Sequence, residues 1–303
     1  MMDAKKVAGV EVKKISVLMT THNRVETTLQ CLRTLDALVI PDGIEITPVV
    51  VDAGSIDGTL MRVQEEFPEA TAVGVSKDIF WAQGMRTAWE LAQKLDYDYI
   101  LWLNDDVELY PDALTNLFAE LSDAPGIAVG TVVDPDSKEL TYSGFRQRSR
   151  MRPFKLELVD PRNSDGRCVT LNGNVVLVPA SIDRSLGGFP DGYIHAMADL
   201  AFGFEATKMG IPIKLTGAPV GQCSRNETRG TWVDDKLEMR DRFTKVKGPK
   251  ALPTAVWFRF CMRYGGVVGP LCFASPYLRI LSAALSPSTV TTRIRTKMGY
   301  RHG

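Results

Sequence analysis

Two neighbouring carboxylates follow an apolar segment in the first half of the chain. Residues 100–103 read ILWL, and the next three residues are Asn104, Asp105 and Asp106. In open parallel sheets, ligands bind beyond the carboxyl ends of the strands. Two adjacent carboxylates in that place suit a hard divalent cation, which can in turn bridge phosphate oxygens. A solvated turn whose Asp caps the next helix explains these residues equally well.

A second acidic turn, residues 52–59 with the sequence DAGSIDGT, follows the apolar run 46–51. The carboxylate of Asp52 at the end of a strand is able to accept a hydrogen bond from a base or a ribose. Taken alone, this turn is better interpreted as an Asx-turn that caps a helix. Two such strand-end turns in one sheet favour a nucleotide site.

His195 and Asp199 lie four residues apart at the start of a predicted helix over residues 196–209. Side chains with this spacing share one face of a helix, so both could face one cleft. An Asp at a helix N-terminus usually serves as a cap or as a partner of the helix dipole. The functional alternative is that Asp199 deprotonates a hydroxyl group, whereas His195 alone is more often structural.

Several well-known catalytic motifs are absent from the sequence. It contains no Walker A sequence, no G-x-G-x-x-G after a strand, no G-x-S-x-G elbow and no H-E-x-x-H. These absences count against NTPases, classical dehydrogenases, α/β-hydrolases and zinc proteases. The basic run 146–155 has few aromatic residues, so it gives little support for nucleic-acid binding.

The residues that could do chemistry are spaced along an alternation of predicted strands and helices. This alternation implies βαβ units and therefore an α/β fold with a mixed, mostly parallel sheet between helices. Residues 134–170 look irregular or β-rich, and residues 222–253 lack clear periodicity. The predicted strands cover residues 15–20, 46–51, 71–75, 97–103, 127–133, 174–178 and 211–215, and the predicted helices cover residues 29–38, 59–67, 83–95, 111–121 and 196–209.

Charge and cysteine usage describe the environment that the chain fits. The five cysteines have no C-x-x-C spacing, which argues against structural zinc and a disulfide framework and favours a reducing compartment. The N-terminus lacks the apolar segment of a signal peptide. No stretch reaches the roughly 18–20 uncharged apolar residues of a membrane-spanning helix. Net charge is zero, but residues 242–303 hold eleven Lys and Arg residues and no Asp or Glu.

Together these segments resemble glycosyltransferase family 2, the inverting enzymes with the Rossmann-like GT-A fold. The resemblance runs from about Ile15 to Trp232 and implies transfer of a sugar from a nucleoside diphosphate to an acceptor hydroxyl, with Mg²⁺ or Mn²⁺ on the donor diphosphate. The segments that carry it are ISVLMTTHNR (15–24), VVVDAGSIDGT (49–59), DIFWAQGMRTAWELA (78–92), YDYILWLNDDV (97–107), LNGNVVLVP (171–179) and MADLAFGFEATKMG (197–210).

The resemblance also implies roles for individual residues. Asp199 corresponds to the general base, Asp106 to the metal ligand and Asp52 to the residue that contacts the nucleotide base. The segment 171–179 resembles the one that lines the acceptor side. The residues expected to bind the donor are Thr20, His22, Asn23, Arg24, Asp52, Gly54, Trp81, Gly84, Asn104 and Asp105.

The sequence departs from the family pattern in three places. Ala201 stands where a second acidic residue is usual, and Glu205 where an Arg is usual. The region that often carries a metal-ligating His reads Gly221-Gln222-Cys223. The last departure suggests that Asp106, the diphosphate and water hold the metal. The first two motivate a second hypothesis, a non-catalytic nucleotide-sugar-binding or scaffold protein. A nucleotidyltransferase is disfavoured, because no Gly-rich basic loop follows the first strand.

We expect a catalytic domain over residues 1–241 and a basic, apolar extension over residues 242–303. In residues 254–285, aromatic residues alternate with arginines, without acidic residues, as in interfacial membrane segments. Four further cations lie in the final stretch, at Arg293, Arg295, Lys297 and Arg301. This favours a cytoplasmic protein at the inner face of the cell membrane, close to a glycan or lipid-linked acceptor of surface polysaccharide synthesis. Packing of the extension on the catalytic domain, or a homodimer contact, is an equally weighted alternative.

Overall fold

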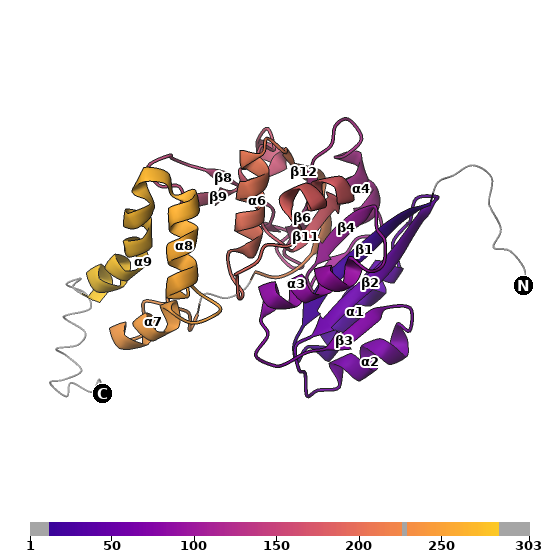
Figure 1. Ribbon diagram of the computed structural model, residues 1–303, viewed down its shortest axis with the longest axis horizontal. Helices are drawn as coiled ribbons and strands as arrows, with labels where there is room; N and C mark the ends of the chain where they lie inside the picture. The colour runs from indigo at the N-terminus through magenta and orange to yellow at the C-terminus, as the bar shows by residue number, and fades with distance from the viewer. Residues whose placement is uncertain (1–11, 226–228, 285–303) are drawn as a thin grey trace, which may run out of the picture. The chain divides into compact units, whose positions relative to one another are not determined.

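The computed structural model describes residues 12–225 and 229–284 and divides the chain into two compact units. Of the described residues, unit 1 comprises 12–147 and 156–225, and unit 2 comprises 148–155 and 229–284. Figure 1 shows the elements of both units along the chain. The C-terminal part of unit 2 begins after residue 225, earlier than the expected domain boundary between residues 241 and 242. The expected domain boundary stays a prediction.

A nine-stranded sheet forms the centre of unit 1, in the order β3-β2-β1-β4-β11-β6-β12-β5, with β7 paired to β6. The pairs β1–β2, β1–β4, β2–β3 and β6–β12 are parallel, while β11 runs antiparallel to both β4 and β6. The strands are β1 Lys13–Thr21, β2 Ile44–Asp52, β3 Thr71–Gly74, β4 Tyr99–Leu103, β5 Glu108–Leu109, β6 Ile127–Val133, β7 Leu140–Tyr142, β11 Val175–Pro179 and β12 Ile213–Gln222.

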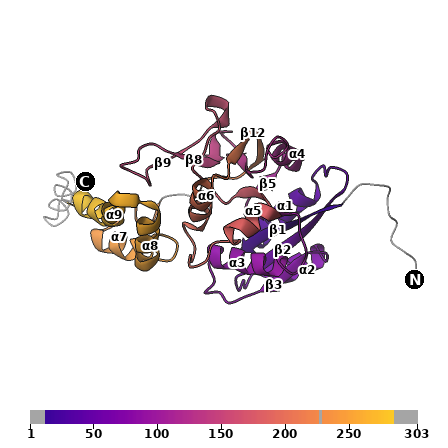
Figure 2. The same ribbon diagram turned by 45° about the horizontal axis from the view of Figure 1, so that its top comes forward.

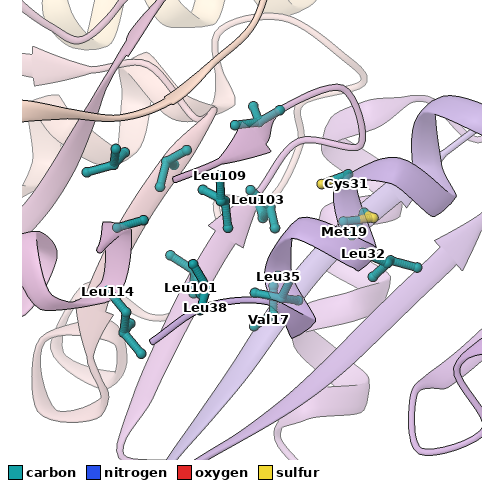
Figure 3. Close-up of a cluster of buried hydrophobic side chains, with 14 of the residues drawn as sticks. Val17, Met19, Cys31, Leu32, Leu35, Leu38, Leu101, Leu103, Leu109 and Leu114 are labelled. Atoms are coloured by element: carbon teal, nitrogen blue, oxygen red, sulfur yellow. The ribbon is translucent and has the colours of Figure 1, made fainter. Parts of the chain in front are cut away.

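Helices cover both faces of this sheet (Figure 2). Alternate residues of β1 point to opposite faces, as the pleat requires. Ile15, Val17 and Met19 join a buried cluster with side chains from α1, α2 and α4 (Figure 3). On the other face, α3 packs on β1 and β2. The helices of unit 1 are α1 Val25–Asp36, α2 Thr59–Glu66, α3 Trp81–Ala92, α4 Ala113–Ala119, α5 Ala180–Leu186 and α6 Ala198–Lys208.

A small antiparallel sheet of three short strands lies in the region expected to be irregular or β-rich. Its order is β10-β8-β9, with β8 Gly144–Gln147, β9 Leu156–Leu158 and β10 Thr170–Leu171. The strand β10 packs against α6, because the Thr170 hydroxyl donates to the Leu200 carbonyl at 2.8 Å and the Thr207 hydroxyl donates to the Val169 carbonyl at 2.8 Å. The small sheet therefore supports the first turns of α6.

Unit 2 is helical. It contains α7 Met239–Val246, α8 Thr254–Tyr264, the 3₁₀ turn η2 Gly266–Val268 and α9 Gly269–Ala284. Helices α8 and α9 pack against each other as a hairpin, and α7 packs on α9. The indole N–H of Trp257 on α8 donates to the Phe273 carbonyl on α9 at 3.2 Å, so a hydrogen bond joins the two helices of the hairpin.

One expectation about unit 2 does not hold. The sequence was expected to contain no segment long and apolar enough to span a membrane. Within the described residues, the helical stretch Gly266–Ala283 meets that criterion by length and composition, with a mean hydropathy of 1.2 and 22% of the stretch buried. The helix continues through Pro276, and Arg279 is a single charge among 18 residues. The basic residues from Arg293 to Arg301 lie outside the described residues.

Candidate active site

Three of the expected site segments follow strands that run in the same direction. Strand β1 ends at Thr21, β2 ends at Asp52 and β4 ends at Leu103, and both β2 and β4 pair in parallel with β1. Their carboxyl ends therefore meet at one edge of the sheet. The structure thus brings together the loop 20–24, the turn 52–54 and the acidic turn 104–106.

The loop after β1 and the turn after β2 are joined by hydrogen bonds. The His22 ring donates from Nδ1 to the Ala53 carbonyl at 2.7 Å. Asn23 adopts a left-handed backbone conformation with φ of 50°, which turns its backbone N–H to the Ser55 hydroxyl at 2.8 Å. Its side-chain oxygen accepts from the Ile56 backbone N–H at 2.8 Å. His22 and Asn23 therefore fix the relative position of two strand ends.

Asp52 and Gly54 shape the turn itself. Asp52 is 2% exposed, and its Oδ1 accepts from both the backbone N–H and the hydroxyl of Ser55, at 3.0 and 2.5 Å. Gly54 has φ of +66°, and a Cβ there would lie 2.8 Å from the Lys77 backbone nitrogen. Only glycine fits this close approach without strain. The turn is thus a rigid, narrow feature with a buried carboxylate.

The acidic turn carries a cation of its own. The Arg24 Nη1 atom lies 3.0 Å from Asp105 Oδ1 and 3.1 Å from Asp106 Oδ2. Burial raises the pKa of Asp105 to about 6, although the Arg24 charge opposes this shift and the Asp106 charge adds to it. The same pair of carboxylates, led by Asp105, raises the pKa of Arg24. Arg24 therefore neutralises part of the charge that two adjacent carboxylates concentrate in one turn.

One oxygen of this turn is suited to a metal ion. Asp106 Oδ1 is buried and has no hydrogen-bond partner, which is the condition of an oxygen that a cation would satisfy. No group of three or more His, Cys, Asp or Glu side chains that could hold a metal occurs in residues 12–225 and 229–284. A site of this kind fits Mg²⁺ or Mn²⁺ that takes one or two carboxylates and completes its shell with phosphate oxygens and water.

Cys223 lies near the same carboxylate. Burial raises the pKa of its thiol to about 12, and the nearby Asp106 charge adds to the shift. Without a bound cation, a thiol in this state stays protonated at neutral pH. Asp106 Oδ1, which is buried without a hydrogen-bond partner, is therefore the candidate metal-facing atom of this turn.

A chain of side-chain hydrogen bonds leads from the acidic turn into the protein. Asn104 accepts from the Trp81 indole N–H at 2.9 Å through Oδ1, and its Nδ2 donates to Asn174 Oδ1 at 2.7 Å. The backbone N–H of Asn104 also donates to the Asn174 carbonyl at 3.0 Å. Both polar atoms of the Asn104 amide are thus engaged within the protein, and Trp81 at the start of α3 is held beside the acidic turn.

Asp199 lies next to this chain of hydrogen bonds. Its Oδ2 accepts from the Gly173 backbone N–H at 3.3 Å, and its Oδ1 accepts from the Leu200 backbone N–H at 2.8 Å. Gly173 lies between Trp81 and Asp199 with no room for a side chain. A Cβ there would lie 2.8 Å from the Trp81 ring and 3.3 Å from Asp199 Cβ. The segment 172–174 therefore joins the acidic turn to the start of α6.

The electrostatics of Asp199 differ from those of a surface carboxylate. Burial raises its pKa to about 6, and the backbone N–H groups of Leu200 and Gly173 oppose the shift. The carboxylate is ionised at neutral pH and able to accept a proton when one is delivered to it. A base with a pKa near the working pH is effective in general base catalysis.

The family model described as glycosyl transferase family 2 matches residues 16–174, a little more than half of the chain. The chain belongs to glycosyl transferase family 2. The match covers the loop after β1, both acidic turns, Trp81 and the segment 172–174, while Asp199 lies beyond it. No curated protein sequence matches the chain significantly.

Solved structures share the fold of this family 2 glycosyltransferase. A mannosyltransferase from Pyrobaculum calidifontis, solved with GDP-Man and Mn²⁺, is 20% identical with a TM-score of 0.50, covering 95% of this chain and 80% of its own. TarS from S. aureus is 14% identical with a TM-score of 0.55, over 90% of this chain and 44% of its own. TarS residues 1–349 are 15% identical with a TM-score of 0.52, over 95% and 93%. The expected GT-A fold is thereby confirmed.

Gly84, His195 and Ala201, which the sequence analysis singled out for different reasons, occupy structural positions. Gly84 is buried on α3, where a Cβ would lie 2.4 Å from Thr20 Cγ2, so these two residues pack α3 on β1. His195 lies three residues before α6 begins, outside the helix that it was expected to start. Ala201 is 1% exposed, so the position usual for a second acid is an apolar contact of α6.

Sequence reasoning did not assign Gly173 and Asn174 to individual roles. The segment 171–179 was expected only to line the acceptor side. The structure shows that Asn174 holds Asn104 and that Gly173 holds Asp199. A signal was present in the sequence, because two polar residues and a glycine (Asn172-Gly173-Asn174) directly precede the apolar strand β11.

Proposed function

We propose that this glycosyltransferase transfers a sugar from a nucleoside-diphosphate sugar to an acceptor hydroxyl with inversion at the anomeric carbon. One observation carries the proposal. Asp199 is a carboxylate with a pKa of about 6, and residues 172–174 connect it by hydrogen bonds to the acidic turn. The donor class is supported by the family and by the mannosyltransferase of the same fold, which was solved with GDP-Man and Mn²⁺.

Asp199 acts as the general base in this reaction. Its carboxylate takes the proton of the acceptor hydroxyl while the oxygen forms a bond to the anomeric carbon, and the bond from that carbon to the diphosphate breaks. A single displacement of this kind inverts the anomeric configuration. The backbone N–H groups of Gly173 and Leu200 fix both oxygens of Asp199, so the carboxylate is oriented before the acceptor binds.

The acidic turn handles the charge of the donor. Asp106 would hold Mg²⁺ or Mn²⁺ through its unpartnered Oδ1, and a bound cation would offset the negative charge on the leaving diphosphate. Arg24 adds a protein cation to the same turn, in contact with Asp105 and Asp106. With a divalent cation bound, the two positive species would together outweigh the two carboxylates and favour a diphosphate at this turn.

The nucleoside lies against the joined loops after β1 and β2. Asp52 is the candidate for a hydrogen bond to the base, since it ends β2 at the same sheet edge as the acidic turn. Gly54 allows the backbone of that turn to approach a neighbouring segment closely. His22 and Asn23 hold the two loops in register, and Thr20 and Gly84 support them from behind.

The acceptor belongs to the synthesis of surface polysaccharide or glycolipid, at the inner face of the cell membrane. Support comes from unit 2, whose hairpin exposes apolar side chains beside Arg259, Arg263 and Arg279. The exposed apolar residues are Phe258, Met262, Val267, Leu271, Leu278 and Leu281. Apolar groups beside cations are what a helix uses to bind an anionic membrane surface. We therefore propose peripheral attachment through residues 254–284.

The experiment that tests the transferase proposal uses the full chain. The purified protein is incubated with nucleoside-diphosphate sugars, with Mn²⁺ or with EDTA, and release of nucleoside diphosphate is measured. We expect release that depends on the metal for one donor class, and thermal stabilisation by the corresponding nucleoside diphosphate. Stabilisation by a donor without any turnover, in the presence of candidate acceptors, would instead favour a binding or scaffold protein.

A further inference from the structure

The basic segment 148–155 groups with the C-terminal unit, although it is far from that unit in the sequence. It connects β8 to β9, and its contacts place it in unit 2 (Figure 1). Phe154 makes the connection, with ring centroids 5.5 Å from Trp257 and 5.0 Å from Phe260 on α8. The aromatic side chain is thus packed on the hairpin that we propose to bind membranes.

The rest of the segment is exposed to solvent except for Pro153, which is buried. Two local hydrogen bonds form turns, from the Arg152 N–H to the Ser149 carbonyl and from the Lys155 N–H to the Arg152 carbonyl, both 3.0 Å long. Arg150, Arg152 and Lys155 are exposed. Met151 lies between the two arginines and is 71% exposed. An apolar side chain held in water between cations has no evident role in folding.

We propose that residues 148–155 form a second membrane-contact element, which places Arg150, Arg152 and Lys155 against anionic lipid headgroups and Met151 at the acyl boundary. The inference rests on the proposed attachment of the α8–α9 hairpin to membranes. Charge complementarity favours an anionic bilayer as the partner, because residues 148–155 contain four cations and no acidic residue. Cations near such a surface attract it additively, and an exposed apolar side chain inserts beside them.

This element is connected to the catalytic unit through short strands. Strand β8 ends directly before the segment and β9 begins directly after it, and β8 pairs with both β9 and β10. Thr170 of β10 donates to the Leu200 carbonyl, one residue after the proposed base. A segment held at the membrane therefore tethers the small sheet that supports the start of α6, which suits an acceptor whose hydroxyl is presented from a lipid.

The test is co-sedimentation of the full chain with vesicles of phosphatidylcholine alone and of equimolar phosphatidylcholine and phosphatidylglycerol, at low and high salt. The variant Arg150→Gln/Arg152→Gln is compared with Lys94→Gln/Arg167→Gln, which removes two exposed cations from unit 1. At about 1 kcal/mol for each cation, we expect the first variant to bind anionic vesicles about 30-fold more weakly at low salt. The control variant should bind like the wild type, and both should keep the wild-type melting temperature.

Two further variants separate the inference from the attachment on which it rests. Met151→Ser should weaken binding, whereas Met209→Ser, an exposed methionine of unit 1, should not. Val267→Asp places a charge at the 98% exposed position of η2 and should weaken binding through the hairpin. Wild-type protein that ignores anionic vesicles overturns the attachment itself. Loss with Val267→Asp but none with Arg150→Gln/Arg152→Gln overturns only the role of residues 148–155.

Discussion

The acidic turn 104–106 and the start of α6 each supply a carboxylate to the site, but their surroundings differ. Asp105 and Asp106 share the Arg24 side chain, whereas Asp199 is held by backbone N–H groups of Gly173 and Leu200. A turn with two carboxylates and one paired cation keeps a net negative charge, so it is suited to bind a further cation. A carboxylate held by rigid backbone donors, without a paired cation, is suited to accept a proton.

The largest effect expected from this contrast is the loss of the base. Asp199→Asn keeps the shape of the side chain but removes its ability to accept a proton. We expect turnover to fall by about 10²–10⁴-fold while the donor still binds, as measured by diphosphate release and by thermal shift with nucleoside diphosphate. Glu205→Gln on the same helix is the matched control. If Asp199→Asn transferred sugar within a few-fold of the wild type, Asp199 would only cap α6 and Glu205 would become the next candidate.

The second effect concerns the metal. Asp106→Asn keeps the turn but weakens the ligand at Oδ1. Because even groups that only support metal ligands change metal affinity by about 10–100-fold, we expect the Mn²⁺ concentration for half-maximal activity to rise by at least about 100-fold. Asp112→Asn, an exposed carboxylate a few residues later, should leave it unchanged. Full wild-type activity in EDTA would remove the metal from the mechanism.

The pH dependence of activity separates the two carboxylates with the same pKa. Burial raises the pKa of both Asp105 and Asp199 from 3.8 to about 6. A base works in its ionised form, so kcat/KM should fall about tenfold for each pH unit below about 6 and be level above it. Asp105→Asn should leave this acidic limb in place if Asp199 is the base. Disappearance of the limb in Asp105→Asn would assign it to the acidic turn instead.

The same shifts predict the sign of a stability change. A carboxyl whose pKa is higher in the folded state binds its proton more tightly there. The stability contributed by Asp105 and Asp199 is therefore fully present below pH 3.8 and is lost as pH rises through about 6. The ionised carboxylates therefore lower the free energy of unfolding most above about pH 6, where the proposed base is active. Chemical unfolding of Asp199→Asn and wild type at pH 5 and pH 8 measures this difference.

Local sequence pattern predicted seven of the nine strands of the sheet, because most of these are apolar runs closed by polar residues. The acidic turns were found for the same reason, since Asp52 ends the buried strand β2 and the turn 104–106 follows the buried strand β4. The short strands β5 and β7 were not predicted, and β12 continues to Gln222, beyond the predicted end at residue 215. The prediction that His195 and Asp199 share one face of a helix was wrong. Met197 adopts a left-handed conformation with φ of 74°, and α6 begins only after it. A single non-glycine residue with positive φ is not visible in hydrophobic periodicity.

Contacts between distant segments could not be derived from periodicity at all. Asn174 meets Asn104 across 70 residues of sequence, and Phe154 meets Trp257 across an even longer interval. The aromatic contacts of Phe154 with Trp257 and Phe260 accompany the grouping of residues 148–155 with the C-terminal unit, and no local pattern predicts them. Helices α5 and α7 were not predicted. Helix α5 begins directly after β11, and α7 lies within residues 222–253, which lack clear periodicity.

The smallest expected effect concerns the residues that link the two carboxylate regions. Trp81→Phe removes the indole N–H that donates to Asn104, and Asn104→Ala removes this acceptor together with the bond to Asn174. A neutral hydrogen bond contributes about 1 kcal/mol, so Trp81→Phe should lose about fivefold in kcat/KM and Asn104→Ala, which removes two such bonds, about 30-fold. If the pair acts as one unit that positions Trp81 beside Gly173 and Asp199, the double variant should lose little more than Asn104→Ala alone.

Additive losses that appear as a raised KM for the donor would show instead that Trp81 and Asn104 contact the donor independently, as the resemblance to the family implies. Non-additive losses confined to kcat would show that the acidic turn and the base are held in register by side chains that touch neither substrate.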